Sequence, residues 1–326
     1  MATGEFDLIR RWFAQLGAAR DDVLLGVGDD AAVLHVPDGH DLVVTVDTMV
    51  AGVHFPVDTA PEDIGHKLLA VNLSDLAAMG AQPAWVTLAL TLPEVDATWL
   101  DAFALGLGSL AQRHGVALIG GDTTRGPLTL SIQAHGFTPH DQAITRAGAK
   151  PGDLIYLTGK VGDAGLALLA LQEQLRLPRP DRDAVLPRLN RPTPRISAGL
   201  ALRGIATAAI DVSDGVAADL GHILERSGVG ATLYAERLPI SATLRKWLDA
   251  AGGWTMPLTA GDDYELLVTV PDARQAEAEA AMAAIDCGFT WVGLIEACPG
   301  LRCQLDDGTE LTVAGGYQHF GSTHDR

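Results

Sequence analysis

Cysteine is scarce in this chain of 326 residues, and aromatic residues make up only 5% of it. The cysteines are Cys287, Cys298 and Cys303, and neither a CxxC pair nor a histidine-rich spacing accompanies them. Their rarity argues against a disulfide framework and against a structural zinc site. We expect three free thiols in a reducing compartment.

Positive charge is scarce as well. The chain holds 23 Lys and Arg against 41 Asp and Glu, which gives a net charge of −18 at pH 7 and a pI near 4.8. A chain this acidic repels nucleic acids and anionic membrane surfaces, so we expect neither as a partner. No apolar run is long enough to cross a bilayer, and residues 5–16 show a charged, amphipathic helical pattern rather than a signal peptide. We expect a cytoplasmic protein.

Several common catalytic and nucleotide-binding patterns are missing. Gly26 and Gly28 with Ala31 fit the relaxed dinucleotide-binding spacing, but a strand and a turn follow them where that motif needs a helix. Gly159 and Gly162 lie between a strand and a helix without the GxxxxGK[ST] spacing of a P-loop, so we interpret them as packing residues. No Ser/His/Asp or Cys/His arrangement indicates a catalytic nucleophile.

An aspartate-rich hairpin is the first feature that points to a site. Residues 31–36 and 42–46 read as two strands joined by a turn at 37–41. Such a hairpin would bring Asp30 close to Asp47, and two neighbouring carboxylates stay ionised only beside a cation such as Mg²⁺. The alternative is a polar turn whose acids are solvated.

The first half of the chain continues as alternating helices and strands. We predict helices over residues 61–80 and 97–114, and strands over 84–92, 116–119 and 128–134.

Two stretches within these elements carry oxygen ligands. Asp75 falls on a predicted helix that is apolar on most sides, where a carboxylate is costly unless it is paired or bound to metal. A capping or hydrogen-bonding role for Asp75 is the alternative. The paired glycines of residues 120–126, GGDTTRG, would let the backbone approach a ligand closely, and Asp122 and two threonines supply oxygens for metal or phosphate. A plain turn is the alternative.

The second half begins with a boundary near residues 138–150. We predict strands over 154–158 and 266–270, a helix over 164–175, and an exposed, Pro- and Arg-rich connection over 176–195. The stretch 210–215, IDVSDG, opens another helix, and Ser213 could cap it.

Acids beside glycine turns or element ends thus recur in five places along the chain. They are Asp29 with Asp30, Asp47, Asp75, Asp122, and Asp211 with Asp214. No single place is specific, but their repetition is typical of a nucleotide site that holds several Mg²⁺ ions.

Seven segments in order resemble one known family. They are VGDDAAV at 27–33, VDTMVAGVHF at 46–55, NLSDLAAMGA at 72–81, GGDTTRGPL at 120–128, RAGAKPGD at 146–153, DVSDG at 211–215 and DDYEL at 262–266. Together they resemble thiamine-monophosphate kinases, which belong to the aminoimidazole ribonucleotide synthetase superfamily. The match runs from about residue 4 to Tyr317.

The resemblance implies a mixed α/β (α+β) fold of two domains. Residues 1–140 would form an ATP- and Mg²⁺-binding domain whose sheet pairs with that of a second subunit in a homodimer. Residues 141–326 would form an α/β domain that completes the substrate site. The implied activity is ATP-dependent conversion of thiamine monophosphate to thiamine diphosphate, with several Mg²⁺ ions per site.

The resemblance also implies roles for individual residues. The implied metal site comprises Asp30, Thr45, Val46, Asp47, Asp75, Asp122, Asp211 and Asp214. ATP would contact Gly121, Asp122, Arg146 and Ser213. The thiamine phosphate would face His54, Asp262 and Tyr317, and a hydrogen-bonded loop histidine is the alternative for His54.

Two positions depart from the family pattern. Val46 stands where a hydroxyl residue is usual, so a metal contact there must use the backbone carbonyl. Asp262 replaces the more usual glutamate and is one methylene shorter.

The implied chemistry agrees with the absence of a catalytic nucleophile. The acceptor is a phosphate oxygen that is largely deprotonated at neutral pH, so the reaction needs no general base. Arg146 is a candidate for stabilising charge on the transferred group. Two other readings stay open, namely a different ATP-dependent enzyme of the same superfamily and a non-catalytic nucleotide-binding protein.

Overall fold

The computed structural model describes residues 5–251 and 253–313. It divides the chain into two compact units. Unit 1 comprises Met1–Leu76 and Ala81–Ala143, and unit 2 comprises Ala77–Gly80 and Ile144–Arg326. Both contain helices and sheet, so the predicted mixed α/β class is confirmed.

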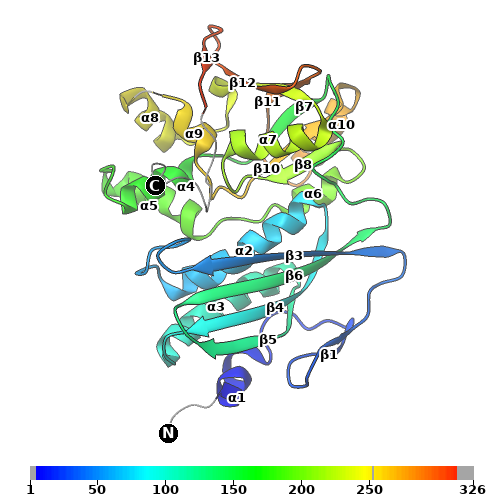
Figure 1. Cartoon of the computed structure of the whole chain (residues 1–326), viewed down its shortest axis with the longest axis vertical. Coiled ribbons are helices and arrows are strands. Elements are labelled where there is room, and N and C mark those ends of the chain that lie inside the picture. The colour runs from blue at the N-terminus through cyan, green and yellow to red at the C-terminus, as the bar shows by residue number, and fades with distance from the viewer. Residues whose placement is uncertain (1–4, 252, 314–326) are drawn as a thin grey trace. The chain divides into compact units, whose positions relative to one another are not determined.

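Unit 1 is built on a four-stranded sheet (Figure 1). Its strands are β3 (His40–Val50), β4 (Gln82–Leu92), β5 (Ala117–Arg125) and β6 (Thr129–Pro139), in the order β3-β6-β4-β5. The β4–β5 pair is parallel and the other two pairs are antiparallel. Strands β3 and β5 are therefore the two edges of the sheet.

Two long helices of unit 1 follow the predicted bounds closely. They are α2 (Pro61–Ala78), whose last residues group with unit 2, and α3 (Ala97–His114). Asp96 caps α3 by accepting from the backbone N–H groups of Thr98 and Trp99, and Gly115 ends it in the left-handed conformation. Leu68, Leu69 and Leu73 are fully buried, as the apolar pattern of α2 predicts.

The backbones of α2 and α3 approach each other closely at two glycines. A Cβ atom on Gly106 would lie 1.9 Å from the carbonyl oxygen of Glu62, and one on Gly65 would lie 2.2 Å from that of Phe103. Glycine at these two positions is therefore a requirement of helix packing rather than of backbone conformation.

The predicted hairpin between residues 31 and 46 is wrong. Strand β2 (Val33–Leu34) pairs with β1 (Val23–Leu25), whereas β3 pairs along its whole length with β6. The turn-like residues before β3 do form a turn, but the long β6 offers β3 many more hydrogen bonds than a short local partner could. The pairing that was expected to bring Asp30 to Asp47 is absent.

The turn that is the alternative for residues 120–126 does not form. Strand β5 runs through the glycines to Arg125, and its register against β4 shifts between Val86 and Thr87. Gly121 has a φ of 151°, and a Cβ there would lie 1.9 Å from the carbonyl oxygen of Leu88. Gly121 thus permits close strand pairing beside a bulge rather than a turn, whereas a Cβ on Gly120 would meet nothing within 4 Å.

The N-terminal segment of unit 1 is helical, as predicted. It forms a short α-helix, α1 (Glu5–Leu8), and continues as a π-helix, η1 (Ile9–Phe13). Trp12 and Phe13 are buried, and Trp12 Nε1 donates to Asp101 Oδ1 on α3 at 2.6 Å.

Unit 2 is built on a seven-stranded sheet in the order β13-β12-β9-β11-β7-β10-β8. The strands are β7 (Leu154–Thr158), β8 (Ala208–Asp211), β9 (Gly230–Tyr234), β10 (Leu266–Val270), β11 (Phe289–Glu296), β12 (Gly300–Gln304) and β13 (Glu310–Leu311). Among the strands described in this unit, only the β9–β12 pair is parallel. The predicted strands at 154–158 and 266–270 are confirmed.

The helices of unit 2 surround two apolar clusters. They are α4 (Asp163–Leu171), α5 (Arg179–Asn190), α6 (Ile196–Leu202), α7 (Val216–Ser227), α8 (Ala242–Ala251), α9 (Thr255–Thr259) and α10 (Gln275–Ala283), with short 3-10 turns η2 (Ala235–Arg237) and η3 (Asp272–Arg274). The larger cluster joins the apolar side of α7 to the sheet, and the smaller joins α4, α5 and α8.

One connection in unit 2 was misread from the sequence. Residues 176–195 were expected to be an exposed connection, but most of them form α5, with Val185 and Leu189 buried against α4 and α8. Pro178 precedes this helix and Pro180 lies in its first turn, where a missing N–H costs nothing. Proline therefore marks the start of a helix here and not a loop.

Helix α7 matches its prediction. Leu220, Ile223 and Leu224 are buried, and Gly228 ends the helix in the left-handed conformation. In the described part of the chain, no helix is both long and apolar enough to cross a membrane.

We predict that Gly106→Ala lowers the free energy of unfolding by about 1–3 kcal/mol, because the added methyl group collides with the backbone of α2. Gly108→Ala in the same helix is the matched control, since its Cβ would meet nothing closer than Leu16 at 3.5 Å. That change should stabilise α3 by about 0.5–1 kcal/mol. Urea denaturation of both variants checks the pair, and equal stabilities would contradict the close packing.

Candidate active site

In unit 1, three of the predicted metal ligands lie together between β3 and α2. Thr45 Oγ1 donates a short hydrogen bond to Asp75 Oδ2. The backbone N–H of Asp47 donates to Asn72 Oδ1 at 3.1 Å, and Asn72 itself is fully buried and donates to the carbonyl oxygen of Leu68. Because Asn72 and Asp75 are three residues apart on α2, they share the helix face that meets β3.

Two further predicted residues lie near this group in sequence. Val46 alternates with Thr45 and Asp47 along β3, and its side chain is 63% exposed. His54 lies in the turn after β3, where its Nδ1 accepts from the backbone N–H of Val50 at 3.0 Å. That bond leaves the proton of a neutral His54 on Nε2.

The remaining predicted residues of unit 1 lie elsewhere. Asp30 is exposed in the loop between β1 and β2, where its backbone N–H donates to Asp29 Oδ1 at 2.8 Å. Gly121 and Asp122 lie on β5, at the opposite edge of the sheet from β3. Asp47 and Asp122 are therefore separated by β6 and β4, a distance of about 14 Å for three strand spacings.

In unit 2, one buried carboxylate organises the DVSDG segment. Asp219 is 2% exposed, and its Oδ2 accepts from the backbone N–H groups of Ser213, Asp214 and Gly215 at 3.0–3.1 Å. Burial raises the pKa of Asp219 to about 7, although the three donors oppose the rise. The alternative role for Ser213 as a side-chain cap of α7 is not seen, because Gly215 occupies the N-cap position without a side-chain bond.

The DDYEL segment is hydrogen-bonded directly to this loop. The backbone N–H of Asp262 donates to the carbonyl oxygen of Ser213 at 2.9 Å, and that of Tyr264 donates to Val212 at 2.8 Å. Asp262 and Tyr264 both have positive φ, at 66° and 51°, and Tyr264 Oη donates to Asp262 Oδ1 at 3.1 Å. The predicted substrate residue Asp262 and the predicted ATP residue Ser213 are thus held side by side.

A buried ion pair supports the same segment. Glu265 is 1% exposed, and its carboxylate accepts from Arg188, Arg195 and Thr158 at 2.5–2.7 Å. Burial alone would raise the pKa of Glu265, but Arg195 and its other partners outweigh burial and lower it. Arg188 and Arg195 come from the stretch that was misread as an exposed connection.

The neighbouring Asp263 is also buried. Its Oδ2 accepts from the backbone N–H of Gly162 at 2.7 Å, and burial raises its pKa well above the usual value. This bond ties the strand–glycine–helix loop after β7 to the DDYEL segment.

Arg146 borders a cavity of about 540 Å³ in unit 2, together with His222, Glu225 and Arg226. The last three residues lie on α7. Ser227 Oγ accepts from the backbone N–H groups of Gly148 and Ala149 at 3.2 Å, which anchors the segment after Arg146 to the end of α7.

Tyr317, the third predicted substrate residue, lies outside the described residues. Among the residues that are described, no group of three or more His, Cys, Asp or Glu side chains is gathered as a metal site would require. The donors near Asp75 are hydroxyl and carboxylate oxygens, which suit Mg²⁺ rather than zinc or copper.

Known protein families match this chain over the two regions that contain these motifs. The profile of the AIR synthase related protein N-terminal domain matches residues 28–138, and that of the C-terminal domain matches residues 150–306. A thiamine-monophosphate kinase of Escherichia coli K12 is 46% identical over 324 residues, which cover 99% of this chain and all of that protein. The chain belongs to the thiamine-monophosphate kinase family.

Solved structures of this family have the same fold. The thiamine-monophosphate kinase of Stenotrophomonas maltophilia K279a is 48% identical, with a TM-score of 0.82 over 88% of this chain and 92% of that chain. The protein AaThiL, solved in complex with AMPPCP and TMP, is 30% identical, with a TM-score of 0.77 over 90% and 92% of the two chains. The fold implied by the family resemblance is confirmed.

The sequence analysis missed residues that hold the predicted ones in place. Asn72 accepts from the backbone of Asp47, and Asp219 accepts from that of Ser213. Ser227 holds the segment after Arg146, and Glu265, with its arginines, holds the segment that contains Asp262. Asp219 carried a usable signal, because it is an acid in the first turn of a helix that begins directly after Gly215. Ser227 carried none.

We predict that Glu265→Gln lowers the free energy of unfolding by about 3 kcal/mol at neutral pH, because two arginines lose their buried partner. Since the pKa of Glu265 is lowered in the folded state, its stabilisation is present above the unfolded pKa and is lost as pH falls through the folded pKa. The difference between wild type and variant should therefore shrink in acid.

Chemical denaturation at neutral pH and at successively lower pH values measures this difference. Glu277→Gln is the control, because that carboxylate pairs with an arginine at the surface and its loss should change stability little. A difference that stayed constant across the acidic range would show that the charge of Glu265 is not what stabilises the fold.

Proposed function

We propose that this protein transfers the γ-phosphoryl group of ATP to thiamine monophosphate, giving ADP and thiamine diphosphate. The observation that carries the proposal is the grouping of Thr45, Asp47 and Asp75 between β3 and α2, in a chain whose family members are named for this reaction. Buried Asn72 holds the Asp47 backbone in that group.

The side chains fit Mg²⁺ as the metal. Thr45 and Asp75 present oxygen atoms within one hydrogen bond of each other, and a small number of carboxylates suits an ion that takes its other ligands from water and phosphate. Mg²⁺ would neutralise charge on the ATP phosphates when bound. We assign its ligands to Asp30, Thr45, the carbonyl of Val46, Asp47, Asp75, Asp122, Asp211 and Asp214.

We assign ATP contacts to Gly121, Asp122, Arg146 and Ser213. The backbone of Ser213 is fixed by Asp219 and by Asp262, so the loop needs little reorganisation on binding. Arg146 carries positive charge that would stabilise the phosphates in an otherwise acidic chain.

Thiamine monophosphate would be held by His54, Asp262 and Tyr317. The thiazolium ring is cationic, so the carboxylate of Asp262 is a suitable partner. A phosphate monoester has its second pKa near ~6, so its oxygen is already a nucleophile at neutral pH. The residues therefore align and bind the reactants, and none has to remove a proton.

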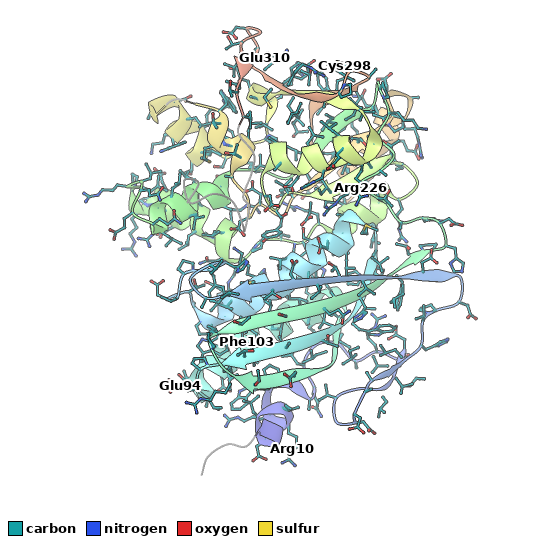
Figure 2. The ribbon with its side chains drawn as sticks, in the orientation of Figure 1. Arg10, Glu94, Phe103, Arg226, Cys298 and Glu310 are labelled. Atoms are coloured by element: carbon teal, nitrogen blue, oxygen red, sulfur yellow. The ribbon has the colours of Figure 1, made fainter. Side chains whose placement is uncertain are left out.

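We predict that the purified protein, mixed with ATP, Mg²⁺ and thiamine monophosphate, forms equal amounts of ADP and thiamine diphosphate. Asp75→Asn should reduce this turnover at least about a hundredfold while the fold is retained. Chromatography of the products checks both results, with Glu94→Gln, a neutralised acid in an exposed loop (Figure 2), as the control.

Other products would lead to other conclusions. ADP without thiamine diphosphate would indicate a different acceptor within the superfamily. Binding of ATP without any ADP would indicate a nucleotide-binding protein that lacks catalysis.

We further propose that the protein works as a homodimer in the cytoplasm. Leu42, Val44 and Val46 leave an apolar row exposed along β3, with exposed fractions from 44 to 63%. Asp47 and Asp122 lie on opposite edges of the sheet, so one copy of unit 1 does not bring them together. The free thiols of the three cysteines suit a reducing compartment.

We predict that Asp47→Asn and Asp122→Asn, each inactive alone, restore activity when their subunits are mixed and allowed to exchange. If Asp47 of one copy works with Asp122 of the other, random pairing leaves about a quarter of the wild-type sites intact. Activity of the mixture, measured with size-exclusion chromatography as a check on assembly, tests this. A mixture as inactive as its parents would place both residues in one subunit's site.

A further inference from the structure

The hydroxyl group of Tyr264 lies against the carboxylate of a proposed substrate residue. Tyr264 Oη donates to Asp262 Oδ1 at 3.1 Å. We propose that Tyr264 is a positioning residue for substrate binding, which holds the Asp262 carboxylate ready for the cationic ring of thiamine monophosphate. The inference rests on the proposed function and deepens it, because it adds a residue that the sequence motifs leave without a role.

The side chains of the DDYEL segment alternate between two sides. Asp263 and Glu265 are each 1% exposed. Asp263 Oδ2 accepts from the backbone N–H of Gly162, and the Glu265 carboxylate accepts from two arginines. Asp262 and Tyr264 are half-buried. The buried pair therefore anchors the segment, and the half-buried pair lies on the side that a ligand can reach.

The backbone at Tyr264 is unusual for a tyrosine. Its φ of 51° lies in the left-handed region, which bulky side chains rarely adopt. Glycine or asparagine would fit this conformation with less strain. Strained residues of this kind persist only where their surroundings hold them, and they gather at functional sites. A tyrosine here is therefore explained by what its side chain does, and the bond to Asp262 is such a role.

The bond from Tyr264 orients a charge without neutralising it. A phenol is an uncharged donor, so the Asp262 carboxylate that accepts from it keeps its full negative charge. Glu265 shows the contrasting arrangement, because the two arginines that bond to it compensate its charge. A carboxylate held by a neutral donor suits a cationic ligand, which supplies the compensating charge itself.

The backbone of the segment is held by other bonds. The N–H of Asp262 donates to the carbonyl oxygen of Ser213 at 2.9 Å, and the N–H of Tyr264 donates to that of Val212 at 2.8 Å. Neither bond uses the tyrosine hydroxyl. Tyr264→Phe therefore removes the restraint on the Asp262 side chain while the loop itself stays in place.

Steady-state kinetics of Tyr264→Phe, with thiamine monophosphate and ATP varied in turn, tests the proposal. We expect the KM for thiamine monophosphate to rise about three- to tenfold, because a carboxylate without this restraint has to be ordered on binding. The kcat and the KM for ATP should change less than about twofold, since the bond acts on substrate binding and not on the transferred group.

Two further variants separate positioning from other effects. Asp262→Gly removes the carboxylate, and glycine accepts the φ of 66° at that position. In this background Tyr264→Phe should lower kcat/KM for thiamine monophosphate no further. Tyr156→Phe is the matched control, because Tyr156 Oη donates to Glu279 Oε1 at 2.8 Å between β7 and α10, and the loss of that bond should leave the KM unchanged. Thermal unfolding of each variant verifies that the fold is retained.

Four results would overturn the inference. They are an unchanged KM for thiamine monophosphate in Tyr264→Phe, an equal rise in its KM for ATP, an equal effect of Tyr264→Phe with and without the Asp262 carboxylate, and an equal rise in Tyr156→Phe.

Binding measurements distinguish a failure of this inference from a failure of the proposed function. If the wild-type protein forms no thiamine diphosphate, the proposed function is refuted, and calorimetry of thiamine monophosphate binding to the same variants replaces the kinetics. Binding that weakens in Tyr264→Phe only while the Asp262 carboxylate is present would then support positioning without kinase activity. Absence of binding to the wild type would refute both.

Discussion

The hydrogen bonds between two loops of unit 2 are the constraint on which its candidate site depends. Val212, Ser213, Asp262 and Tyr264 are joined by backbone bonds, and the carboxylate of Asp219 gathers three more N–H groups of the first loop. Neither loop belongs to a helix or a strand, so without these bonds their polar backbone groups would be unsatisfied. Glu265 and its two arginines then fix the start of β10, from which the second loop extends.

In unit 1, regular secondary structure rather than bonds between loops positions the candidate ligands. There the candidate ligands stand on regular elements, and α2 presents Asn72 and Asp75 to β3 from one helix face. A site built on a helix and a strand is positioned by packing as well as by hydrogen bonds. The tight approach of α2 to α3 at Gly65 and Gly106 is part of that packing.

The sequence predicts helices of this protein better than it predicts strand partners. Periodicity and caps located α2, α3 and α7, because those signals are local. The long strand β3 pairs with β6, about ninety residues further along the chain, and no local pattern reports such a pairing. Likewise the glycines of β5 read as a turn, because only the neighbouring β4 shows that they sit in a strand.

The same difference between local signals and long-range contacts applies to the candidate site. Motifs located Asp75, Ser213 and Asp262, whose chemistry can be recognised from residue type and spacing. Ser227 and Glu265 act through residues distant in the chain, so their roles depend on the fold.

The positive φ of Asp262 has a consequence for how this position can vary. Aspartate and asparagine tolerate the left-handed region better than longer side chains, because their short polar groups bond locally. Glutamate, the residue that the family resemblance leads one to expect here, lacks that local compensation. The shorter aspartate side chain therefore extends less far toward a ligand than glutamate would, but it stabilises the left-handed backbone better. Variation at this position is limited by backbone conformation as much as by the chemistry of binding.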